Sequence, residues 1–498
     1  MKAPLAQYPG MNRFVLDWLN GDERFLRRNT RVDDGAPAAS RPVRWLPAGL
    51  TAALKQSNKQ WGLFVGDQLE KWASGGTLTI IAGQQVGFAG GPLYTLAKIA
   101  SLVRFKRDME KNGVPVTAFF WLATEDHDFD EVARLNVPAS DRQLDLLCIR
   151  AVRTAESRVA VGSQPVPEEL IAQLLAMYEI PRPAWLREGI TFRDSFAELI
   201  AEMFGSEIIL VDALLPELRR AGAPLFDKIR ANHDQIQKKL HDRARELDSA
   251  GYSEQVIARD GNEYTLFFEL DEHGRRSLAK ADTPPERTST SALTRPLLQD
   301  FVLQPDIFVG GPAEVAYYAQ ISPLHEMLGV PMPRVALRGH VLVAPKRVVK
   351  AIDRLSIQPR EIFTNADAIL AEREPEAVAK VRALADEGKR ELMQRIAQIG
   401  ELALPAEHSL AGSIQRSVGH LEYHFDKLAE RAVKGLVRKD RERHAAVREV
   451  VTTLYPDRHV QDRVVSWFAY WCRFREVLIE RVIEEVEPDS AYFKVISL

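Results

Sequence analysis

Two polar clusters directly follow apolar segments in the first third of the chain. The first is the run Gly83-Gln84-Gln85, which follows the apolar stretch 78–82. The second is the run Glu125-Asp126-His127-Asp128, which follows the apolar stretch 116–124. Parallel strands that carry polar groups at their carboxyl ends form the crevice in which open α/β sheets bind ligands. The pairing therefore predicts an enzyme active site where these two strands end.

The first cluster opens a glycine-rich turn. Gly87, Gly90 and Gly91 let the backbone turn tightly and bring its N–H groups near a ligand, and the helix predicted to follow adds its positive dipole end. This arrangement suits a phosphate or a carboxylate. The spacing matches neither G-x-G-x-x-G nor the P-loop pattern, so glycines that merely permit a tight turn are an alternative interpretation. The adjacent amides of Gln84-Gln85 favour binding, because they hydrogen-bond well to a polar substrate.

The second cluster carries the candidate catalytic groups. A histidine flanked by carboxylates holds one tautomer and can act as a general base, so His127 is the candidate base, supported by Asp126 or Asp128. Four ionisable groups after an apolar strand would be costly if they were buried without a purpose. A helix cap made by Thr124 or Asp126 is the alternative. A metal site at His127 and Asp128 lacks further clustered ligands, so we expect no metal.

A third cluster follows another apolar segment. Gly310-Gly311-Pro312 opens a predicted helix and so repeats the arrangement of the first cluster. Glu314 and Tyr317 are three residues apart on one face of this helix, which also carries Gln320, and they could form an acidic wall for a substrate amino group. Glu314 also suits the positive end of the helix dipole, which is an alternative reason for its place.

Basic residues near these clusters are candidate anion ligands. Arg295, just before the third cluster, could bind a carboxylate, although a solvated helix position explains it equally well. Lys346-Arg347, after the last predicted strand, could neutralise a phosphate, although an exposed strand end is the more common explanation. Together with Arg463 and Tyr470 near the carboxyl terminus, this pair is the candidate for a second nucleotide site.

Alternating strands and helices must place the three clusters at one edge of a sheet. Apolar runs of strand length alternate with helical periodicities, with interruptions at 137–200 and 249–300. A hairpin is predicted inside the second interruption, 263–270 with 275–279. The core strands are predicted at 77–82, 116–124, 207–212, 306–309 and 334–344, and the helices between them begin at 92, 195 and 313. The pattern predicts an α/β fold with a doubly wound, mostly parallel sheet and two insertions.

Strand patterns stop after about residue 366. Apolar residues then recur at alternating steps of four and three on both sides of the Leu404-Pro405 turn, which is typical of an antiparallel helical hairpin or coiled coil. A pair of long helices needs a further surface to cover it, so we expect a homodimer through this arm. A final helix, 460–486, is rich in Trp, Tyr and Phe and is predicted to pack against the core.

Composition narrows the classes of function. At 498 residues the chain is too long for one core, and its formal net charge of −3 provides no electrostatic footprint for nucleic acid or an acidic membrane. Its two cysteines, Cys148 and Cys472, are far apart and lack metal-type spacing. The amino terminus has no signal-peptide pattern, and no apolar run approaches the length of a membrane span. We expect a cytoplasmic protein that binds neither nucleic acid nor membrane.

Five motifs occur along the chain. They are Gly83-Gln84-Gln85-x-Gly87…Gly91-Pro92-Leu93-Tyr94-Thr95-x-x-Lys98, Trp121-Leu122-Ala123-x-Glu125-Asp126-His127-Asp128-Phe129-Asp130-Glu131, Gly310-Gly311-Pro312-x-Glu314-x-Ala316-Tyr317-x-Ala319-Gln320, Gly329-Val330-Pro331-Met332-Pro333 and Leu454-Tyr455-Pro456…Val460-Gln461-Asp462-Arg463. With these motifs the chain resembles the cysteine-adding enzyme family of bacillithiol biosynthesis over essentially its whole length. Ala82 stands where that family usually has Thr, and Phe88-Ala89-Gly90 replaces its commoner Leu-Phe-Thr.

The resemblance implies a Rossmann-like core with two connecting insertions, a C-terminal α-helical coiled-coil arm and a homodimer. It also implies a ligase that joins the carboxylate of L-cysteine to the amine of glucosaminyl malate in the last step of bacillithiol synthesis. His127, with Asp126 or Asp128, would then deprotonate the attacking amine. The residues that would bind substrate or nucleotide are Gly83, Gln84, Gln85, Gly87, Gly90, Gly91, Tyr94, Glu125, Arg295, Gly310, Gly311, Glu314, Tyr317 and Gln320.

Amide formation from a carboxylate in water needs activation, most simply by ATP, with Mg²⁺ as an optional companion. The core looks like the class I nucleotidyl-transfer fold, but Gln84-Gln85 stands where that fold has a His-x-Gly-His sequence, and no Lys-x-Ser-Lys-Ser-like loop occurs. ATP or ADP binding is therefore an expectation from family and fold. Two rival interpretations remain. One is a different α/β transferase that binds a nucleotide or sugar in the same crevice, and the other is a coiled-coil assembly protein with a vestigial crevice.

These patterns divide the chain into consecutive stretches. Residues 1–136 comprise N-terminal helices and the first part of the core, 137–200 the first insertion, 201–248 a continuation of the core, 249–300 the second insertion, 301–365 the last part of the core, 366–455 the arm and 456–498 a C-terminal helix packed on the core.

Overall fold

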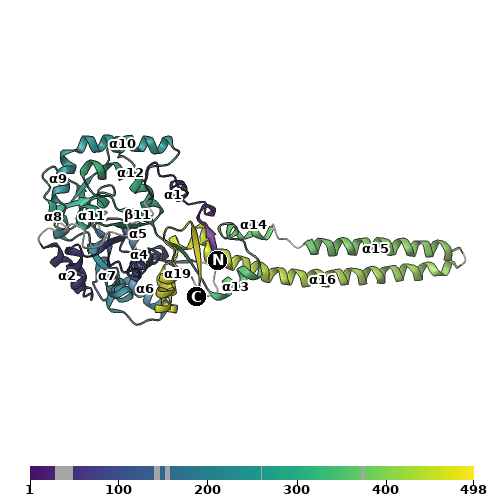
Figure 1. The fold of residues 1–498 in the computed structure, drawn as a ribbon. Helices are drawn as coiled ribbons and strands as arrows, with labels where there is room; N and C mark the ends of the chain where they lie inside the picture. The colour runs from purple at the N-terminus through teal and green to yellow at the C-terminus, as the bar shows by residue number, and fades with distance from the viewer. Residues whose placement is uncertain (29–48, 139–145, 152–157, 260, 372–375, 406) are drawn as a thin grey trace. The chain divides into compact units, whose positions relative to one another are not determined.

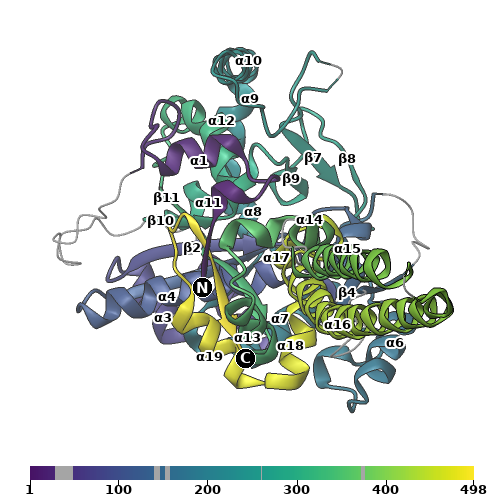
Figure 2. The ribbon, with the colours of Figure 1, turned by 90° about the vertical axis from the view of Figure 1, so that its right-hand side faces the viewer.

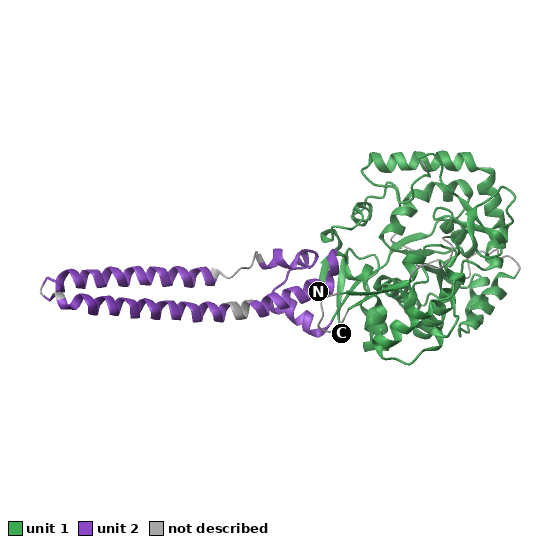
Figure 3. Ribbon diagram, turned by 180° about the vertical axis from the view of Figure 1, so that it is seen from behind, with its two compact units in different colours: residues 1–344, 459–498 green, residues 345–458 purple. Residues whose placement is uncertain are grey.

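The computed structural model describes residues 1–498 except 29–48, 139–145, 152–157, 260, 372–375 and 406. The described residues form two compact units, coloured separately in Figure 3. The first unit comprises residues 1–344 and 459–498, and the second comprises residues 345–458. Within the described parts of the chain, no helix combines the length and apolar character that a membrane span requires.

A parallel sheet forms the centre of the first unit. Its strands, in spatial order, are β11 (Arg334–Leu337), β10 (Ile307–Gly310), β2 (Leu78–Gln84), β3 (Val116–Leu122) and β6 (Ile209–Asp212). All four neighbouring pairs are parallel. Every residue of β3 is buried, as expected for a strand whose two faces are both covered. The prediction of a doubly wound parallel α/β sheet is confirmed.

The strand order places a topological switch point beside β2. From β2 the chain proceeds to β3 and β6 on one side of the sheet, and then to β10 and β11 on the other side. Ligands in doubly wound sheets bind outside the carboxyl ends of the strands at such a point. The residues that follow β2, β3 and β10 are the three clusters identified in the sequence.

Helices connect the core strands as the periodicity predicts. α4 (Leu93–Lys111) joins β2 to β3, and Pro92 is its N-cap residue rather than its first helical residue. Gly113 follows its end with φ of +80°, which confirms the predicted stop. α7 (Phe192–Phe204) precedes β6, and α12 (Pro312–Leu328) joins β10 to β11.

Both predicted insertions carry small antiparallel sheets. In the first, β5 (Leu146–Arg150) pairs with β4 (Arg134–Pro138), which begins three residues before the predicted start of the insertion at 137. The second contains the predicted hairpin, β7 (Phe267–Leu270) with β8 (Arg276–Leu278), and a further strand, β9 (Thr288–Thr290), pairs with β7. The structure therefore confirms the hairpin and adds β9 to it.

The prediction of one strand over 334–344 was wrong. β11 ends at Leu337, and β12 (His340–Ala344) belongs to a separate sheet with β13 (Tyr492–Ser497) and β1 (Lys2–Pro4). Figure 2 shows the chain's N-terminal and C-terminal strands side by side. The break falls at Gly339, where a Cβ atom would lie 2.3 Å from Val486 Cγ2, so this position admits only glycine against the C-terminal segment.

The single final helix predicted over 460–486 was also wrong. The segment forms α17 (Gln461–Val464), α18 (Trp467–Phe474) and α19 (Glu476–Glu485). Ser466 caps α18, because its side chain accepts a hydrogen bond from the Phe468 N–H, and Arg475 separates α18 from α19 with φ of +48°. Four aromatic residues of α18, Trp467, Phe468, Tyr470 and Trp471, are buried as predicted, whereas Phe474 is half-buried.

The second unit contains the predicted helical hairpin. α15 (Glu376–Ala403) and α16 (Ala411–Leu454) lie side by side and run in opposite directions (Figure 1). Gly388 on α15 lets the ring of Phe425 on α16 approach closely, and Lys389 Nζ donates to Asp426 Oδ1 at 2.8 Å across the pair. The helices therefore pair as an antiparallel hairpin as predicted, but Leu384, Ile399, Leu421 and Leu428 of the apolar pattern read from the sequence are exposed.

The remaining helices complete both units. They are α1 (Arg13–Leu19), α2 (Leu50–Gln60), α3 (Gly66–Ala73), α5 (Phe129–Val132), α6 (Glu168–Tyr178), α8 (Pro216–Ala221), α9 (Ala223–Ala231), α10 (His233–Ser249), α11 (Arg295–Leu303), α13 (Lys346–Arg354) and α14 (Ala366–Ala371).

Candidate active site

A pocket of about 660 Å³ lies at the carboxyl ends of the core strands; we call it the large pocket. The first, second and third clusters all contribute to its wall, together with strands of the second insertion. Its lining includes the predicted residues Gly83, Gln84, Gln85, Tyr94, Glu125, Asp126, His127, Arg295, Gly311, Glu314, Tyr317 and Arg463. The polar ends of separate strands therefore converge on one space, as the topology requires.

A buried lysine connects the first and third clusters. The side chain of Lys98 on α4 is 3% exposed, and its Nζ donates to the Gly83 carbonyl at 2.8 Å and to Gln84 Oε1 at 2.7 Å. The same ammonium forms an ion pair with Glu314 Oε2 at 2.5 Å. Burial lowers the pKa of Lys98, and the Glu314 carboxylate opposes that shift.

Glu314 serves its own helix as well as the lysine. Its Oε2 also accepts a hydrogen bond from the Gly311 N–H at 2.7 Å, at the first turn of α12. The explanation of Glu314 as a carboxylate placed at the positive end of a helix is therefore correct. Its side chain is 24% exposed and still faces the large pocket, so both interpretations apply to this residue.

The candidate base lies beside one carboxylate and one guanidinium. His127 Nδ1 is 3.3 Å from Asp126 Oδ1 and 3.4 Å from Arg276 Nη1. Asp126 is itself held, because it accepts from the His127 N–H at 2.7 Å and from the side-chain amide of Gln85. Arg276 can only donate, so its contact makes Nδ1 an acceptor and puts the proton of a neutral ring on Nε2. The Nε2 lone pair would be available for proton transfer only in the other tautomer, with the proton on Nδ1 directed at Asp126.

Asp128 has the role of a helix cap. Its side chain accepts from the Glu131 N–H at 3.1 Å and so caps α5. It is not part of the lining of the large pocket. A helix cap was the alternative for this cluster, and the capping residue is Asp128 rather than Thr124 or Asp126. Of the two carboxylates proposed to support His127, the one that contacts it is Asp126.

The second insertion supplies Arg276, which sequence reasoning missed. This residue begins β8, is 9% exposed, and its guanidinium lies 4.0 Å from the centre of the Phe268 ring of β7. Its Nη2 donates to the Thr290 carbonyl of β9, and its Nη1 is 3.6 Å from Asp126 Oδ1. The small antiparallel sheet thus places a cation against the Asp126–His127 pair.

Glu125 lies at the base of the large pocket and is 5% exposed. Its two carboxylate oxygens accept from the hydroxyls of Ser289 at 2.8 Å and Thr290 at 2.7 Å, and Arg219 Nη2 lies 3.6 Å away. Two hydroxyls and a guanidinium offset the loss of hydration that burial imposes on this carboxylate.

Two cations of the large pocket, Arg295 and Arg463, form no ion pair with the described residues, although Glu314 and Asp462 lie near enough to interact with them electrostatically. Arg295 at the start of α11 donates to Gln299 Oε1 at 3.1 Å and approaches the Tyr317 hydroxyl at 3.5 Å, and both groups are neutral. Burial raises the pKa of Tyr317 to about 12, so its phenol stays protonated. Among the described residues neither Arg295 nor Arg463 forms an ion pair, which leaves positive charge available to an anionic ligand.

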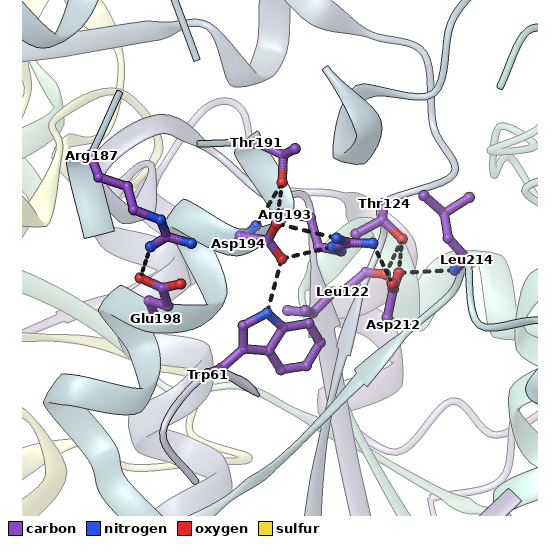
Figure 4. Close-up of polar contacts among 10 residues, drawn as sticks. All are labelled: Trp61, Leu122, Thr124, Arg187, Thr191, Arg193, Asp194, Glu198, Asp212 and Leu214. Carbon is purple, nitrogen blue, oxygen red and sulfur yellow. Dashed lines mark hydrogen bonds and ion pairs between the residues drawn. The ribbon is translucent and has the colours of Figure 1, made fainter. Parts of the chain in front are cut away.

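Main-chain contacts and a polar network behind the pocket hold the second cluster. The Val161 N–H donates to the Asp126 carbonyl at 2.7 Å, and the Gly162 N–H donates to the Thr124 carbonyl at 2.9 Å. Figure 4 shows the network: the Thr124 hydroxyl donates to Asp212 at the end of β6, and Arg193 lies between Asp212 and Asp194. These contacts fix the backbone from which Glu125 and Asp126 project.

Several predicted binding residues lie outside the large pocket. Gly87, Gly90, Gly91 and Gly310 are not among its lining residues. The Gly90 carbonyl instead accepts from Trp467 Nε1 at 3.0 Å, so this turn packs on α18. Gln320 is fully buried, and its Oε1 accepts from the N–H groups of Gln255 and Val256 at 3.1 Å. Gln320 therefore acts on the pocket through the loop that carries Gln255 and Val256.

The predicted second nucleotide site draws on both compact units. Lys346 and Arg347 begin α13 in the second unit, where Arg347 Nε is 2.5 Å from Glu449 Oε1. Arg463 and Tyr470 belong to the first unit, and the Tyr470 hydroxyl accepts from Gln461 Nε2 at 2.9 Å. This site stays a prediction. In the described part of the chain, His, Cys, Asp and Glu side chains form no group of three suited to a metal ion.

Local sequence signals for the missed residues were weak. Lys98 had a local signal. It is a charged residue on the side of α4 that Leu96, Ile99 and Leu102 bury, and it follows Tyr94 by four residues. Arg276 and the hydroxyl pair Ser289-Thr290 had none, because their contacts with the site are made across elements distant in the sequence. The same holds for Arg338, which follows β11 and also lines the large pocket.

Comparison with known proteins divides the chain near residue 340, and the C-terminal match also includes residues 459–498 of the first unit. A family model described as Bacillithiol biosynthesis BshC, N-terminal Rossmann-like domain, matches residues 38–283 and 278–339, and the corresponding C-terminal coiled-coil domain matches residues 341–498. The chain belongs to the bacillithiol biosynthesis BshC family. This assignment confirms the resemblance read from the five motifs, the Rossmann-like core and the coiled-coil arm.

Individual BshC relatives match along most of their length. "Putative cysteine ligase BshC" of Koribacter versatilis is 30% identical over 97% of this chain and 96% of its own. Relatives of the same name from Solibacter usitatus and Bacillus anthracis are 29% and 26% identical, over 98% and 82% of this chain and the same shares of theirs. The chain is accordingly a ligase, and this favours an enzyme over an assembly protein with a vestigial crevice.

Proposed function

We propose that the chain joins the carboxylate of L-cysteine to the amine of glucosaminyl malate, forming an amide in the last step of bacillithiol biosynthesis. The name of its relatives supports cysteine as one substrate. The observation that carries the proposal is the composition of the large pocket. It combines a histidine–carboxylate pair, suited to deprotonating an amine, with guanidinium groups that form no ion pair among the described residues and suit carboxylates or phosphates.

The charge of each pocket residue indicates which substrate group it would bind. Arg295, with the neutral Tyr317 phenol beside it, would hold an anionic group of a substrate. Glu314 and Glu125 would face the positively charged amino groups. As the amine nitrogen bonds to the acyl carbon, the bond from that carbon to its oxygen leaving group breaks. The proton lost by the nitrogen passes to His127 Nε2, and Asp126 stabilises the resulting imidazolium.

We further propose ATP as the source of activation, since a carboxylate does not acylate an amine in water unaided. The pocket fits a polyphosphate in charge, because Arg295 and Arg463 line it and form no ion pair among the described residues. ATP would convert the carboxylate oxygen into a leaving group. Arg295 and Arg463 are the residues that would hold its phosphates.

The test is product formation by the purified full-length chain. L-cysteine, glucosaminyl malate and ATP should yield the amide, with AMP or ADP, in mass spectra. His127→Ala should lower kcat by about 10²–10⁴-fold, the usual contribution of a general base. The matched control is His273→Ala, because His273 also lies beside a carboxylate, Glu272 at 3.6 Å, but is exposed outside the pocket. Near-normal turnover by folded His127→Ala would eliminate the base assignment, and product without ATP would eliminate the activation scheme.

We also propose that two copies associate through the helical arm. Large apolar side chains on both helices of the arm are exposed, among them Leu384, Ile399 and Leu402 on α15 and Leu421 and Leu428 on α16. Several large apolar side chains exposed on one pair of helices are typical of a protein–protein interface. A second copy of the same arm would cover it with a matching apolar stripe.

A further inference from the structure

Arg295, the candidate anion ligand of the large pocket, is oriented by two neutral groups. Its Nη1 donates to Gln299 Oε1, one turn further along α11, at 3.1 Å, and its Nη2 approaches the Tyr317 hydroxyl at 3.5 Å. Glu314 lies near enough to interact with the guanidinium electrostatically. An amide and a phenol orient a guanidinium without neutralising it, so these two contacts leave the charge of Arg295 to a ligand.

The side-chain amide of Gln299 connects Arg295 to a buried carboxylate. Gln299 is fully buried and is not part of the lining of the large pocket, so it does not itself reach the ligand. Its Nε2 donates to Asp300 Oδ1 at 3.1 Å, while its Oε1 accepts from Arg295. If the amide were turned over, its NH₂ group would face the guanidinium, and two donors would meet. The contact with Arg295 therefore depends on which way this amide points.

Asp300 fixes the orientation of that amide. It is fully buried, and three groups that can donate converge on it: the Gln299 amide, the Tyr318 hydroxyl at 3.1 Å and His325 Nε2 at 2.9 Å. A carboxylate only accepts hydrogen bonds, so it admits the NH₂ end of Gln299 and disfavours the carbonyl end. Asp300 thus acts on Arg295 through Gln299, although it lies outside the pocket lining.

We propose that Gln299 is a positioning residue that directs Arg295 at an anionic group of a substrate, and that Asp300 holds Gln299 in the orientation this requires. The inference rests on the proposed function for Arg295 as the ligand of an anion. Carboxylates and phosphates present the same acceptor oxygens, and L-cysteine, glucosaminyl malate and ATP each carry one or the other. Loss of Gln299 keeps the charge of Arg295 but releases its guanidinium, so affinity for the anion should fall.

Calorimetric titration of the full-length chain tests Gln299 without requiring turnover. Arg295→Met should weaken binding of L-cysteine, glucosaminyl malate or ATP, which identifies the ligand of Arg295. Gln299→Met, similar in length but unable to replace the amide, should weaken binding of that same ligand at least fivefold and leave the other two within twofold. In the Arg295→Met background, Gln299→Met should cause no further loss, because a residue that acts through Arg295 has nothing left to position.

The matched control is another fully buried amide. Asn58 bonds to the backbone of Leu54 and Leu210 and lies outside the large pocket. Asn58→Leu should lower the melting temperature and leave all three affinities unchanged, as expected of an amide with a merely structural role. In steady-state assays Gln299→Met should raise KM for the ligand of Arg295 at least fivefold and keep kcat within twofold, which is the pattern for loss of uniform binding.

If Gln299→Met does not fold, Asp300→Asn takes its place. Without the carboxylate the Gln299 amide is able to turn over, so the same ligand should bind at least threefold more weakly, again with no further loss in the Arg295→Met background. Unchanged binding in the folded variant, losses that add to that of Arg295→Met, or the lack of any ligand that depends on Arg295 would overturn the inference. A chain whose ligand binding depends on Arg295 and Gln299 but that forms no amide contradicts the proposed function alone.

Discussion

Lys98 holds the two turns that border the large pocket against each other. Its ammonium bonds to the end of β2 and to the first turn of α12, which lie on either side of the switch point. A charge that is 3% exposed is tolerated because all three of these bonds, including one to a carboxylate, replace water. Lys98 therefore sets the distance between Gln84 and Glu314, whatever substrate lies between them.

Replacement of this lysine should affect both stability and turnover. Lys98→Met leaves Glu314 without its cation and should destabilise the chain by about 3 kcal/mol, the usual cost of breaking a buried pair. Its kcat should fall at least tenfold even well below the melting temperature, because Gln84 and Glu314 lose their common anchor. Urea titration and steady-state assays of amide formation measure the two effects.

The matched control for Lys98 is a second buried lysine on the same helix. Lys106→Met removes an ion pair with Glu207, 3.0 Å long, that lies outside the pocket. Arg107 still pairs with Glu207, so the loss of stability should be smaller, and kcat should stay unchanged. Equal losses of turnover in the two variants would show that Lys98 has no specific role at the site.

Two carboxylates in the network behind the site should respond to pH in opposite directions. Burial raises the pKa of Asp212 above its ordinary 3.8. Its contribution to stability is therefore complete below pH 3.8 and is lost as the pH rises through the folded pKa. Burial also opposes ionisation of Asp194, but hydrogen bonds from Arg193 and Trp61 outweigh it and lower the pKa. Its contribution is complete above pH 3.8 and is lost as the pH falls through the folded pKa.

Urea unfolding between pH 3 and 7 tests this difference. The stability of the wild type minus that of Asp212→Asn should fall as the pH rises, because over this range the folded wild type keeps the Asp212 proton that the unfolded chain has lost. The wild type minus Asp194→Asn should rise over the same acid range. Slopes of the same sign in both variants would contradict the assignment of the two shifts.

The candidate site was partly predictable at the level of single residues. Gln84 and His127 were found because they follow apolar strands, and any parallel sheet brings such positions to one edge. Arg276 was not found, because it reaches His127 only through the folding of the second insertion over the core. Gln320 was predicted to bind substrate. In the structure its side-chain amide instead forms hydrogen bonds with the backbone of Gln255 and Val256, a tertiary contact that no local pattern predicts.

At the scale of elements, strands with continuous apolar runs were predicted, but the breaks within 334–344 and 460–486 were not. β2 and β3 lie within two residues of their predicted bounds, because buried strands of a parallel sheet need apolar residues on both faces. The break between β11 and β12 is decided by Val486, which packs against Gly339 from 147 positions further along the chain. No local pattern carries that information.

The glycine-rich turn after β2 has a structural role that a matched pair of variants can test. Gly90 has φ of +84°, and a Cβ atom there would lie within 2.4–2.5 Å of the Trp467 indole. Gly90→Ala should therefore cost about 2–4 kcal/mol, from the positive φ and from overpacking together. Gly113 has a similar φ of +80° but open space around it, so Gly113→Ala should cost about 1 kcal/mol.

Urea midpoints and tryptophan fluorescence report on this pair. Gly90→Ala should also shift the emission of Trp467, whose indole N–H bonds to the Gly90 carbonyl, whereas Gly113→Ala should not. Equal destabilisation of the two variants would mean that backbone strain alone decides the cost. The turn would then pack on α18 less tightly than the 3.0 Å hydrogen bond indicates.

At the scale of the whole molecule, each unit has its own means of stability. The first unit buries a continuous core on both faces of its parallel sheet, whereas α15 and α16 contact each other and leave large apolar side chains exposed. Leu402 is 83% exposed, and Leu428 is 68% exposed. A two-helix hairpin with this much exposed apolar surface is expected to gain stability from a further partner. A second copy of the chain is the simplest partner.

Substitution of the exposed leucines should dissociate this pair. The wild-type chain is expected to have twice its monomer mass by light scattering, and Leu384→Asp/Leu428→Asp should shift the mass toward that of one chain, since a charge buried in an apolar seam is strongly unfavourable. Phe64→Asp is the control, because Phe64 is 79% exposed but lies outside the arm. If the leucine variant keeps the doubled mass, or if Phe64→Asp lowers it, the two copies associate through the first unit and not through the arm.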